Sequence, residues 1–182
     1  MWIYILVGLL VLTLLYLGTT YNSLIVLRNR VKNQWAQVDV QLKKRSDMIP
    51  NLVETVKGYA KHEKETFEAV VEARNKFTTA STTEAEIEAS GELTKVLSKL
   101  MMLSEAYPEL KSDKNFMQLQ LDLKDVEEKI AFARQFYNDR VLAYMEKIQR
   151  FPSNIVAGMF GFKEMKYFEV SESDRETPKV SF

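Results

Sequence analysis

The chain has 182 residues, with 25 Lys and Arg, 25 Asp and Glu, one His and no Cys. This length suits one domain with an appendage, and the lack of Cys excludes disulfides, thiolate zinc sites and thiol nucleophiles. A single His excludes metal sites that need two imidazoles, and a formal net charge of zero argues against a nucleic-acid partner. Six Gly, four Pro and 46% hydrophobic residues favour a helix-rich protein over an all-β one.

Residues 1–20 carry no charged side chain and are dominated by Leu, Val and Ile. About 20 such residues in a helix cross the ~30 Å hydrocarbon core of a bilayer, so we expect a transmembrane anchor here. Trp2 and Tyr4 at one end, with Tyr16 and Tyr21 at the other, are typical of the aromatic belts at bilayer interfaces. A cleaved signal peptide is the weaker alternative, because the basic segment and the small-residue cleavage site that it needs are lacking.

The charges that follow the anchor predict its orientation. Arg28, Arg30 and Lys32 lie closest to it, whereas only the chain amine precedes it. By the positive-inside rule, the N-terminus then lies outside and the rest of the chain in the cytoplasm. The sequence therefore predicts a single-pass membrane protein.

Beyond the anchor, apolar residues recur at alternating spacings of three and four. These apolar seams run over residues 24–42, 49–77, 87–107 and 116–151. Such seams allow antiparallel helices to pack at crossing angles of about 20°. The predicted fold is all-α, with an N-terminal transmembrane helix followed by an antiparallel four-helix bundle of long helices.

Pro, Ser, Thr and Asp residues mark the expected helix boundaries. Ser46 or Asp47 can cap a helix whose first turn accepts Pro50. The alternative is one long helix kinked at Pro50. Residues 80–83 predict a loop before an acidic first turn, and residues 112–113 can open the last long helix.

Catalytic and metal-binding patterns are lacking. His62 has no second His to complete a di-iron bundle or a zincin helix, and residues 158–161 lack the Lys-Ser or Lys-Thr pair of a phosphate-binding loop. Helical carboxylates such as Asp122 and Glu127 are typical of a solvated face. We therefore expect no enzyme, no catalytic residue, no cofactor and no metal site.

Charged residues near the seams are the candidate buried polar residues, namely Arg28, Glu63 and Arg74. Glu63 and Arg74 interrupt the second seam, so each should pair with another helix or extend to solvent along its stem. Contacts that set the helix register are favoured over a ligand pocket. The basic run at 43–45 is expected to be a solvated helix end.

An apolar segment at 155–168 follows the last seam. Its candidate interaction residues are Ile155, Val156, Met159, Phe160 and Phe162. The segment either folds back over an end of the bundle or forms a docking surface for another subunit, a membrane partner or the bilayer interface. The predicted divisions are an anchor at 1–20, a helical bundle at 21–151 and a C-terminal tail at 152–182.

Several motifs point to one family. They include Tyr-Asn-Ser-Leu at 21–24, Ile-Pro-Asn-Leu-Val at 49–53, Glu-Ala-Tyr-Pro at 105–108 and Phe-Pro-Ser-Asn at 151–154. Together they resemble the bacterial LemA family over nearly the whole chain beyond the anchor. The resemblance implies a helical bundle anchored in the bacterial inner membrane, with no catalytic or metal residues to carry over. Some LemA-like proteins have a lipobox Cys where this chain has Thr20, so an extracytoplasmic bundle is the alternative location.

Two hypotheses for the function follow. The first is a non-enzymatic interaction or scaffold protein that contacts the bilayer through residues 1–20 and also binds a protein partner or further copies of itself. The alternative is a membrane-tethered sensor or regulator that binds a small ligand or an anionic lipid between helices, through Arg28, Glu63 or Arg74. An acid/base hydrolase that uses helical carboxylates is the weakest possibility.

Overall fold

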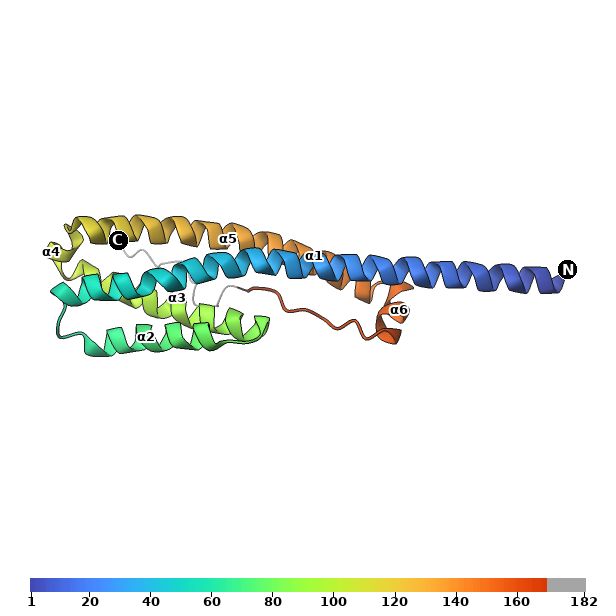
Figure 1. The fold of residues 1–182 in the computed structure, drawn as a ribbon, viewed down its shortest axis with the longest axis horizontal. Helices are drawn as coiled ribbons and strands as arrows, with labels where there is room; N and C mark the ends of the chain where they lie inside the picture. Colours follow the sequence, from blue (N-terminus) through green and yellow to red (C-terminus); the bar gives the residue numbers. More distant parts are fainter. Residues whose placement is uncertain (170–182) are drawn as a thin grey trace, which may run out of the picture. The chain divides into compact units, whose positions relative to one another are not determined.

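The computed structural model describes residues 1–169, and every regular element within them is a helix. The helices are α1 Trp2–Tyr59, α2 Lys64–Thr79, α3 Thr83–Glu105, α4 Pro108–Lys111, α5 Lys114–Gln149 and α6 Ser153–Met159 (Figure 1). The prediction of an all-α protein is confirmed over this range. Residues 170–182 of the predicted tail lie outside it.

Helix α1 resolves the alternatives at Pro50. It runs through Pro50 without interruption, so the first predicted seam and the start of the second belong to one helix. The chain breaks later, because α1 ends at Tyr59 and α2 begins at Lys64. The seam predicted over residues 49–77 therefore belongs to two helices.

Side-chain acceptors begin two of the later helices, as the sequence indicates. The hydroxyl of Thr82 accepts a hydrogen bond from the Ala85 amide at 3.2 Å at the start of α3. The carboxylate of Asp113 accepts one from the Phe116 amide at 2.9 Å at the start of α5. Such caps satisfy first-turn amides that have no intrahelical partner. The loop expected at 80–83 is thus found one residue shorter.

The chain divides into two compact units. The first contains residues 1–36 and 135–167, and the second contains residues 37–134 together with 168–169 of the described chain. Each unit has its own packing, and the candidate membrane anchor belongs to the first.

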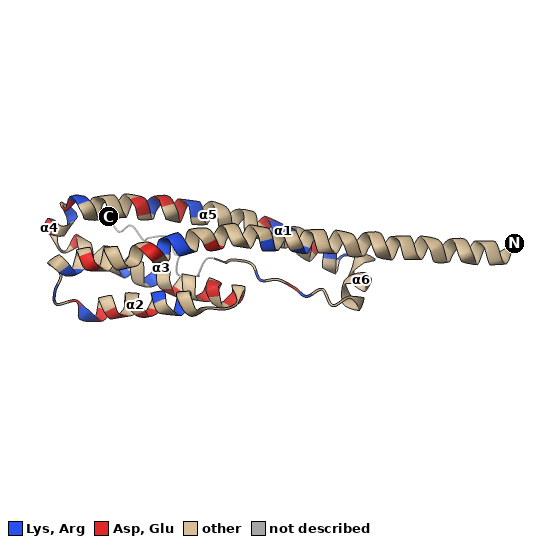
Figure 2. Cartoon of the chain, viewed as in Figure 1, with Lys and Arg blue, Asp and Glu red and all other residues tan. Residues whose placement is uncertain are grey.

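The beginning of α1 is apolar and exposed. Of the described helices, α1 alone is long and apolar enough to cross a membrane, by length and composition. Figure 2 shows that its N-terminal stretch carries no Lys, Arg, Asp or Glu. Leu6 and Leu12, for example, are 64% and 65% exposed. Exposed apolar surface costs about 25 cal/mol per Å² in water but nothing comparable in hydrocarbon, so these residues fit a lipid environment.

The core of the second unit is formed by one apolar stripe from each long helical segment. Its members include Val38, Leu42, Ile49, Leu52 and Val56 of α1, Phe67, Val70 and Phe77 of α2, Leu93, Leu97 and Leu100 of α3, and Phe116, Val126 and Ile130 of α5. Helices α2 and α3 lie side by side (Figure 1). The buried positions are those of the predicted seams, so the three-four spacing identified the core.

Candidate functional site

A guanidinium group is buried in the second unit. Arg45 is only 1% exposed, so the prediction that the basic run forms a solvated helix end is wrong for this residue. Lys43 and Lys44 of the same run are exposed. The difference follows from helix geometry, because position 45 lies three residues after Leu42 and four before Ile49, on the core stripe of α1.

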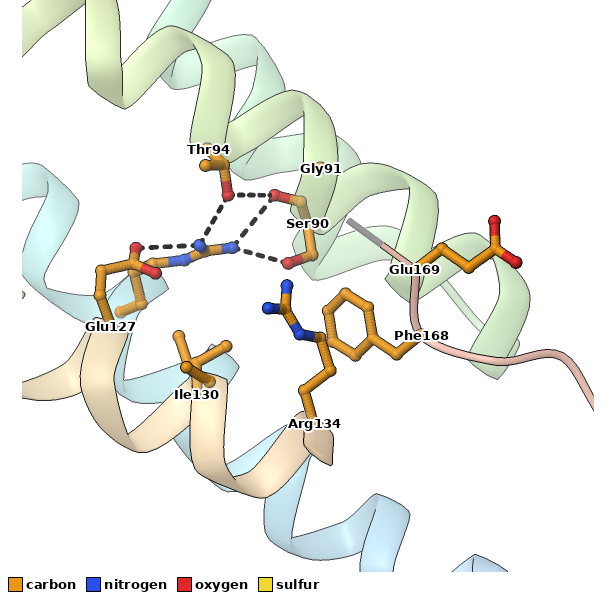
Figure 3. A pocket seen from close by; sticks show the side chains of 10 residues that line it. Ser90, Gly91, Thr94, Glu127, Ile130, Arg134, Phe168 and Glu169 are labelled. Carbon is orange, nitrogen blue, oxygen red and sulfur yellow. Dashed lines mark hydrogen bonds and ion pairs between the residues drawn. The ribbon is translucent and has the colours of Figure 1, made fainter. Parts of the chain in front are cut away.

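Three side chains from α3 and α5 hold Arg45 in place (Figure 3). Its Nη1 atom donates to Thr94 Oγ1 at 2.9 Å and to Glu127 Oε1 at 3.0 Å. Its Nη2 atom donates to the Ser90 hydroxyl at 2.7 Å and to the Ser90 carbonyl at 3.1 Å. A buried charge needs such partners, since its removal from water costs several kcal/mol. Arg45 thereby connects α1, α3 and α5 within this unit.

A cavity of about 240 Å³ lies beside this guanidinium. Its lining includes Ser90, Gly91, Thr94, Ile130, Arg134 and Phe168. At about 30 Å³ of liquid volume per water, the space corresponds to about eight water molecules. Hydroxyl and guanidinium groups line one part of it, and Ile130 and the Phe168 ring line another. The cavity therefore suits a small molecule with both a polar and an apolar part.

Arg134 is the second guanidinium at this cavity. Its Cζ atom lies 5.8 Å from the centre of the Phe168 ring, which is cation–π distance. Within residues 1–169, Arg134 forms no ion pair with a carboxylate. Figure 3 shows the Glu169 carboxylate pointing away from it. Sequence reasoning missed both Arg134 and the cavity, because the lining comes from distant parts of the chain.

Two of the candidate buried polar residues lie in the second unit, and both are half-buried. Arg74 donates from Nε to the Ser46 carbonyl at 3.1 Å. Glu63 accepts from the Tyr107 hydroxyl at 3.5 Å through Oε1. Each residue thus has a partner in its own chain, and neither lines the cavity.

The third, Arg28, lies in the first unit with part of the apolar C-terminal segment. The Phe160 and Phe162 rings lie 4.7 and 5.8 Å from the Tyr21 ring, between centroids, and the Arg28 guanidinium lies 5.3 Å from the Phe162 centroid. Val156 is 1% exposed. This part of the segment packs against α1.

Other side chains of the same segment are open to solvent. Ile155 is 54% exposed, Met159 66% and Phe160 53%. Exposed apolar side chains that lie close together mark contact surfaces for proteins or membranes. We refer to Ile155, Met159 and Phe160 as the α6 surface.

Two tyrosine hydroxyls of α5 fix the chain that follows α6. Tyr144 donates to the Lys163 carbonyl at 2.8 Å, and Tyr137 donates to the Lys166 carbonyl at 2.9 Å. Burial raises the pKa of the Tyr144 hydroxyl, and the charge of Arg28 acts in the opposite direction. The donating, protonated form of Tyr144 is therefore favoured.

Groups that could perform acid/base or metal chemistry do not converge in the part of the chain that the structure describes. No three His, Cys, Asp or Glu side chains come together there to hold a metal ion. Glu127 is bonded to Arg45, and Asp122 accepts from the Gln118 amide at 2.8 Å. His62 is exposed.

Comparison with known proteins gives one family. The model of the LemA family matches residues 34–182. Protein LemA of Metamycoplasma hominis is 23% identical over 155 residues, which cover 85% of this chain and 71% of that protein. Magnetosome protein MamQ 2 of Paramagnetospirillum magneticum is 30% identical over 93 residues, but these cover 51% of this chain and only 34% of that protein. Magnetosome protein MamQ of Magnetospirillum gryphiswaldense is 22% identical over 187 residues, which cover 88% of this chain and 68% of that protein.

Proposed function

This chain belongs to the LemA family, and from that premise we propose that it is a non-enzymatic interaction or scaffold protein tethered to the bacterial inner membrane. A membrane-associated protein of the LemA type agrees with the apolar start of α1. The tether is a single pass through residues 1–20. The partner is a membrane-bound protein or a further copy of this chain.

The contact between Tyr21 and Phe160 is the observation that carries this proposal. Tyr21 is the first residue after the proposed anchor, and its ring lies 4.7 Å from that of Phe160. The exposed side chains of Ile155 and Met159 belong to the same C-terminal segment. A docking surface next to the end of the membrane anchor lies close to the bilayer, so it is accessible to other proteins in the same membrane.

Glutamate substitution of the α6 surface tests the proposal. Met159→Glu should reduce the size of the complex extracted in mild detergent, because a charge opposes burial at an apolar interface. Met102→Glu is the matched control, since Met102 and Met159 are both 66% exposed. A photo-reactive residue at Ile155 should form protein adducts in membranes. Lipid adducts alone, with no change in complex size for Met159→Glu, would contradict a protein partner.

We propose that the helical region lies on the cytoplasmic side, with the extracytoplasmic side as the alternative. Support comes from the basic residues that follow the anchor. Since the chain has no Cys, Asp139→Cys introduces a unique thiol at an exposed position. A membrane-impermeant maleimide should label it only after the cells are permeabilised. Labelling in intact cells would favour the alternative.

The fine architecture is also proposed. We infer that α1, α2, α3 and α5 form the predicted antiparallel four-helix bundle, with the bundle at 21–151 and the tail at 152–182. The apolar stripes that these helices share in the second unit support this view.

A second candidate function is a membrane-tethered sensor or regulator, and the cavity beside Arg45 favours it. The sequence predicts ligand contacts at Arg28, Glu63 or Arg74, which also contact groups of their own chain. The cavity beside Arg45 is a further place where such a ligand would fit. A ligand that binds the folded state raises the melting temperature, so a thermal-shift screen of metabolites and anionic lipids tests it. If no metabolite or lipid raises the melting temperature, the result would count against a sensor function.

A further inference from the structure

Two guanidinium groups lie at the cavity in the second unit, and within residues 1–169 only that of Arg45 has a carboxylate partner. Arg45 donates to Glu127, Ser90 and Thr94, so its charge and most of its donors are satisfied. Arg134 has no carboxylate partner among the described residues. Figure 3 shows its guanidinium beside the Phe168 ring, at the cavity. Among residues 1–169, Arg134 therefore offers donors that no carboxylate occupies.

Arg134 is suited to a carboxylate. A guanidinium presents its donors as a rigid planar fork that matches the two oxygens of a carboxylate. The Phe168 ring, which is 6% exposed, occupies one side of Arg134 at 5.8 Å. The Nη donors of Arg45 are already used within the chain, and the Thr94 hydroxyl donates to the Ser90 carbonyl. Arg134 is therefore the group at this cavity best placed to bind a charged ligand.

The rest of the lining limits the size and character of the ligand. A volume of about 240 Å³ holds only a small molecule. Ile130 and Phe168 offer apolar surface for its body. Gly91 contributes no side chain, and a Cβ atom added there would meet no other atom within 4 Å. Because Gly91 lines the cavity, a large side chain at this position would reduce the volume left for a ligand.

We propose that this cavity binds a small organic carboxylate, with the carboxylate on Arg134 and the apolar body against Ile130 and Phe168. The proposal rests on the second candidate function and names the class of its ligand.

Benzoate is the probe, and benzamide is an uncharged control of the same shape. With the full chain in detergent micelles at about pH 7, benzoate should give a saturable rise in melting temperature and a heat of binding, whereas benzamide should give neither. Arg134→Gln should weaken benzoate binding at least about tenfold, because charge-assisted hydrogen bonds are lost. Arg140→Gln is the matched control, since Arg140 is an exposed arginine of the same helix. It should bind as the unmodified chain does.

Gly91→Leu tests the site without altering any charge. The leucine should fill the open space at Gly91 and abolish benzoate binding while the helix content stays unchanged. Absence of benzoate binding to the unmodified chain would overturn the proposal. So would binding that persists in Arg134→Gln or in Gly91→Leu.

The two failures are distinguishable. If benzamide binds as well as benzoate and Gly91→Leu blocks both, the carboxylate class is wrong, but the cavity remains a ligand site. The conclusion is also the same if the thermal-shift screen finds a compound whose binding is abolished by Gly91→Leu but unchanged by Arg134→Gln: the cavity binds a ligand, but not through a carboxylate on Arg134. If the screen finds no ligand at all, the sensor function itself fails.

Discussion

The guanidinium of Arg45 and the carboxylate of Glu127 meet at 3.0 Å, although the two residues are 82 positions apart in the sequence. Their exposures differ sharply, because the Arg45 side chain is 2% exposed and that of Glu127 is 39% exposed. A buried charge depends on its partner more than an exposed one does, since only the buried charge has lost its hydration. Stability should therefore be more sensitive to this pair than to the exposed ion pairs of the helix surfaces.

Glu127→Gln should lower the free energy of unfolding by about 1–3 kcal/mol. Glutamine keeps an acceptor oxygen near Arg45 but removes the opposite charge. Urea unfolding of the full chain in detergent, followed by circular dichroism, measures the effect. Glu128→Gln is the control, because Glu128 is exposed and its replacement should change stability by less than about 0.5 kcal/mol. Equal effects of the two substitutions would show that the charge of Glu127 does not matter.

Asp113→Ala should destabilise the second unit by about 1–2 kcal/mol. The Asp113 carboxylate caps α5 through the Phe116 amide and also accepts from the Tyr59 hydroxyl at 3.1 Å. That second bond raises the pKa of Tyr59, so the substitution should return this pKa toward its usual value near 10. Unfolding and the absorbance of tyrosinate during titration give the two readouts. An unchanged Tyr59 titration would contradict the hydrogen bond.

Stability should fall at high pH because of Tyr144. Its pKa is raised by burial, so the folded state holds the hydroxyl proton more tightly than the unfolded state does. The resulting stability is complete below the ordinary pKa of about 10 and is lost as the pH rises through the raised value. Tyr144→Phe should cost about 1 kcal/mol near neutral pH through the lost bond to Lys163. It should also show a smaller loss of stability above pH ~10 than the unmodified chain, and an identical loss would exclude Tyr144 as the cause.

Tyr21→Ala should loosen the C-terminal segment. Each aromatic contact contributes about 0.5–1.5 kcal/mol beyond its buried area, and Tyr21 contacts both Phe160 and Phe162. Trypsin should then cleave faster after Lys163, because local opening becomes easier. Phe136→Ala removes an aromatic ring that is 53% exposed and should leave the cleavage rate unchanged.

Much of the fold could be predicted from local patterns. The uncharged run at 1–20 predicted the apolar start of α1, and the three-four spacing found the core positions of α3 and α5. The caps at Thr82 and Asp113 follow from the ability of their side chains to bind first-turn amides. These features depend on neighbours within a few residues.

The wrong prediction concerns Arg45. Its charged neighbours favour a solvated helix end, whereas its position in α1 places it on the side that faces the core. Positions 38, 42, 45, 49 and 52 form an unbroken four-three series, and this series places Arg45 in the core. Its burial could have been anticipated from that spacing. The sequence leaves open whether Pro50 interrupts the helix; in the structure, the Ser46 carbonyl, which Pro50 cannot donate to, accepts from Arg74 Nε, and α1 continues.

The candidate site could not be predicted in the same way. Glu127, Arg134 and Phe168 come to the cavity with Ser90 and Thr94 only through tertiary packing. Helical spacing places Ser90 and Thr94 on one face of α3, and Glu127 and Arg134 on one face of α5, but no spacing relates the two helices to each other or to Phe168. The sequence predicts an apolar segment at 155–168, but it does not separate Val156, which is buried, from Ile155 and Met159, which are exposed.

Phe168 and Glu169 differ from the other residues that line the cavity because they lie outside the helices. Helical walls are held by their own backbone hydrogen bonds, whereas a ring on an irregular segment can retreat without unwinding a helix. The room beside the Arg134 guanidinium therefore depends on where this non-helical segment places the Phe168 ring, so substitutions at position 168 should change the fit of an occupant without altering either arginine.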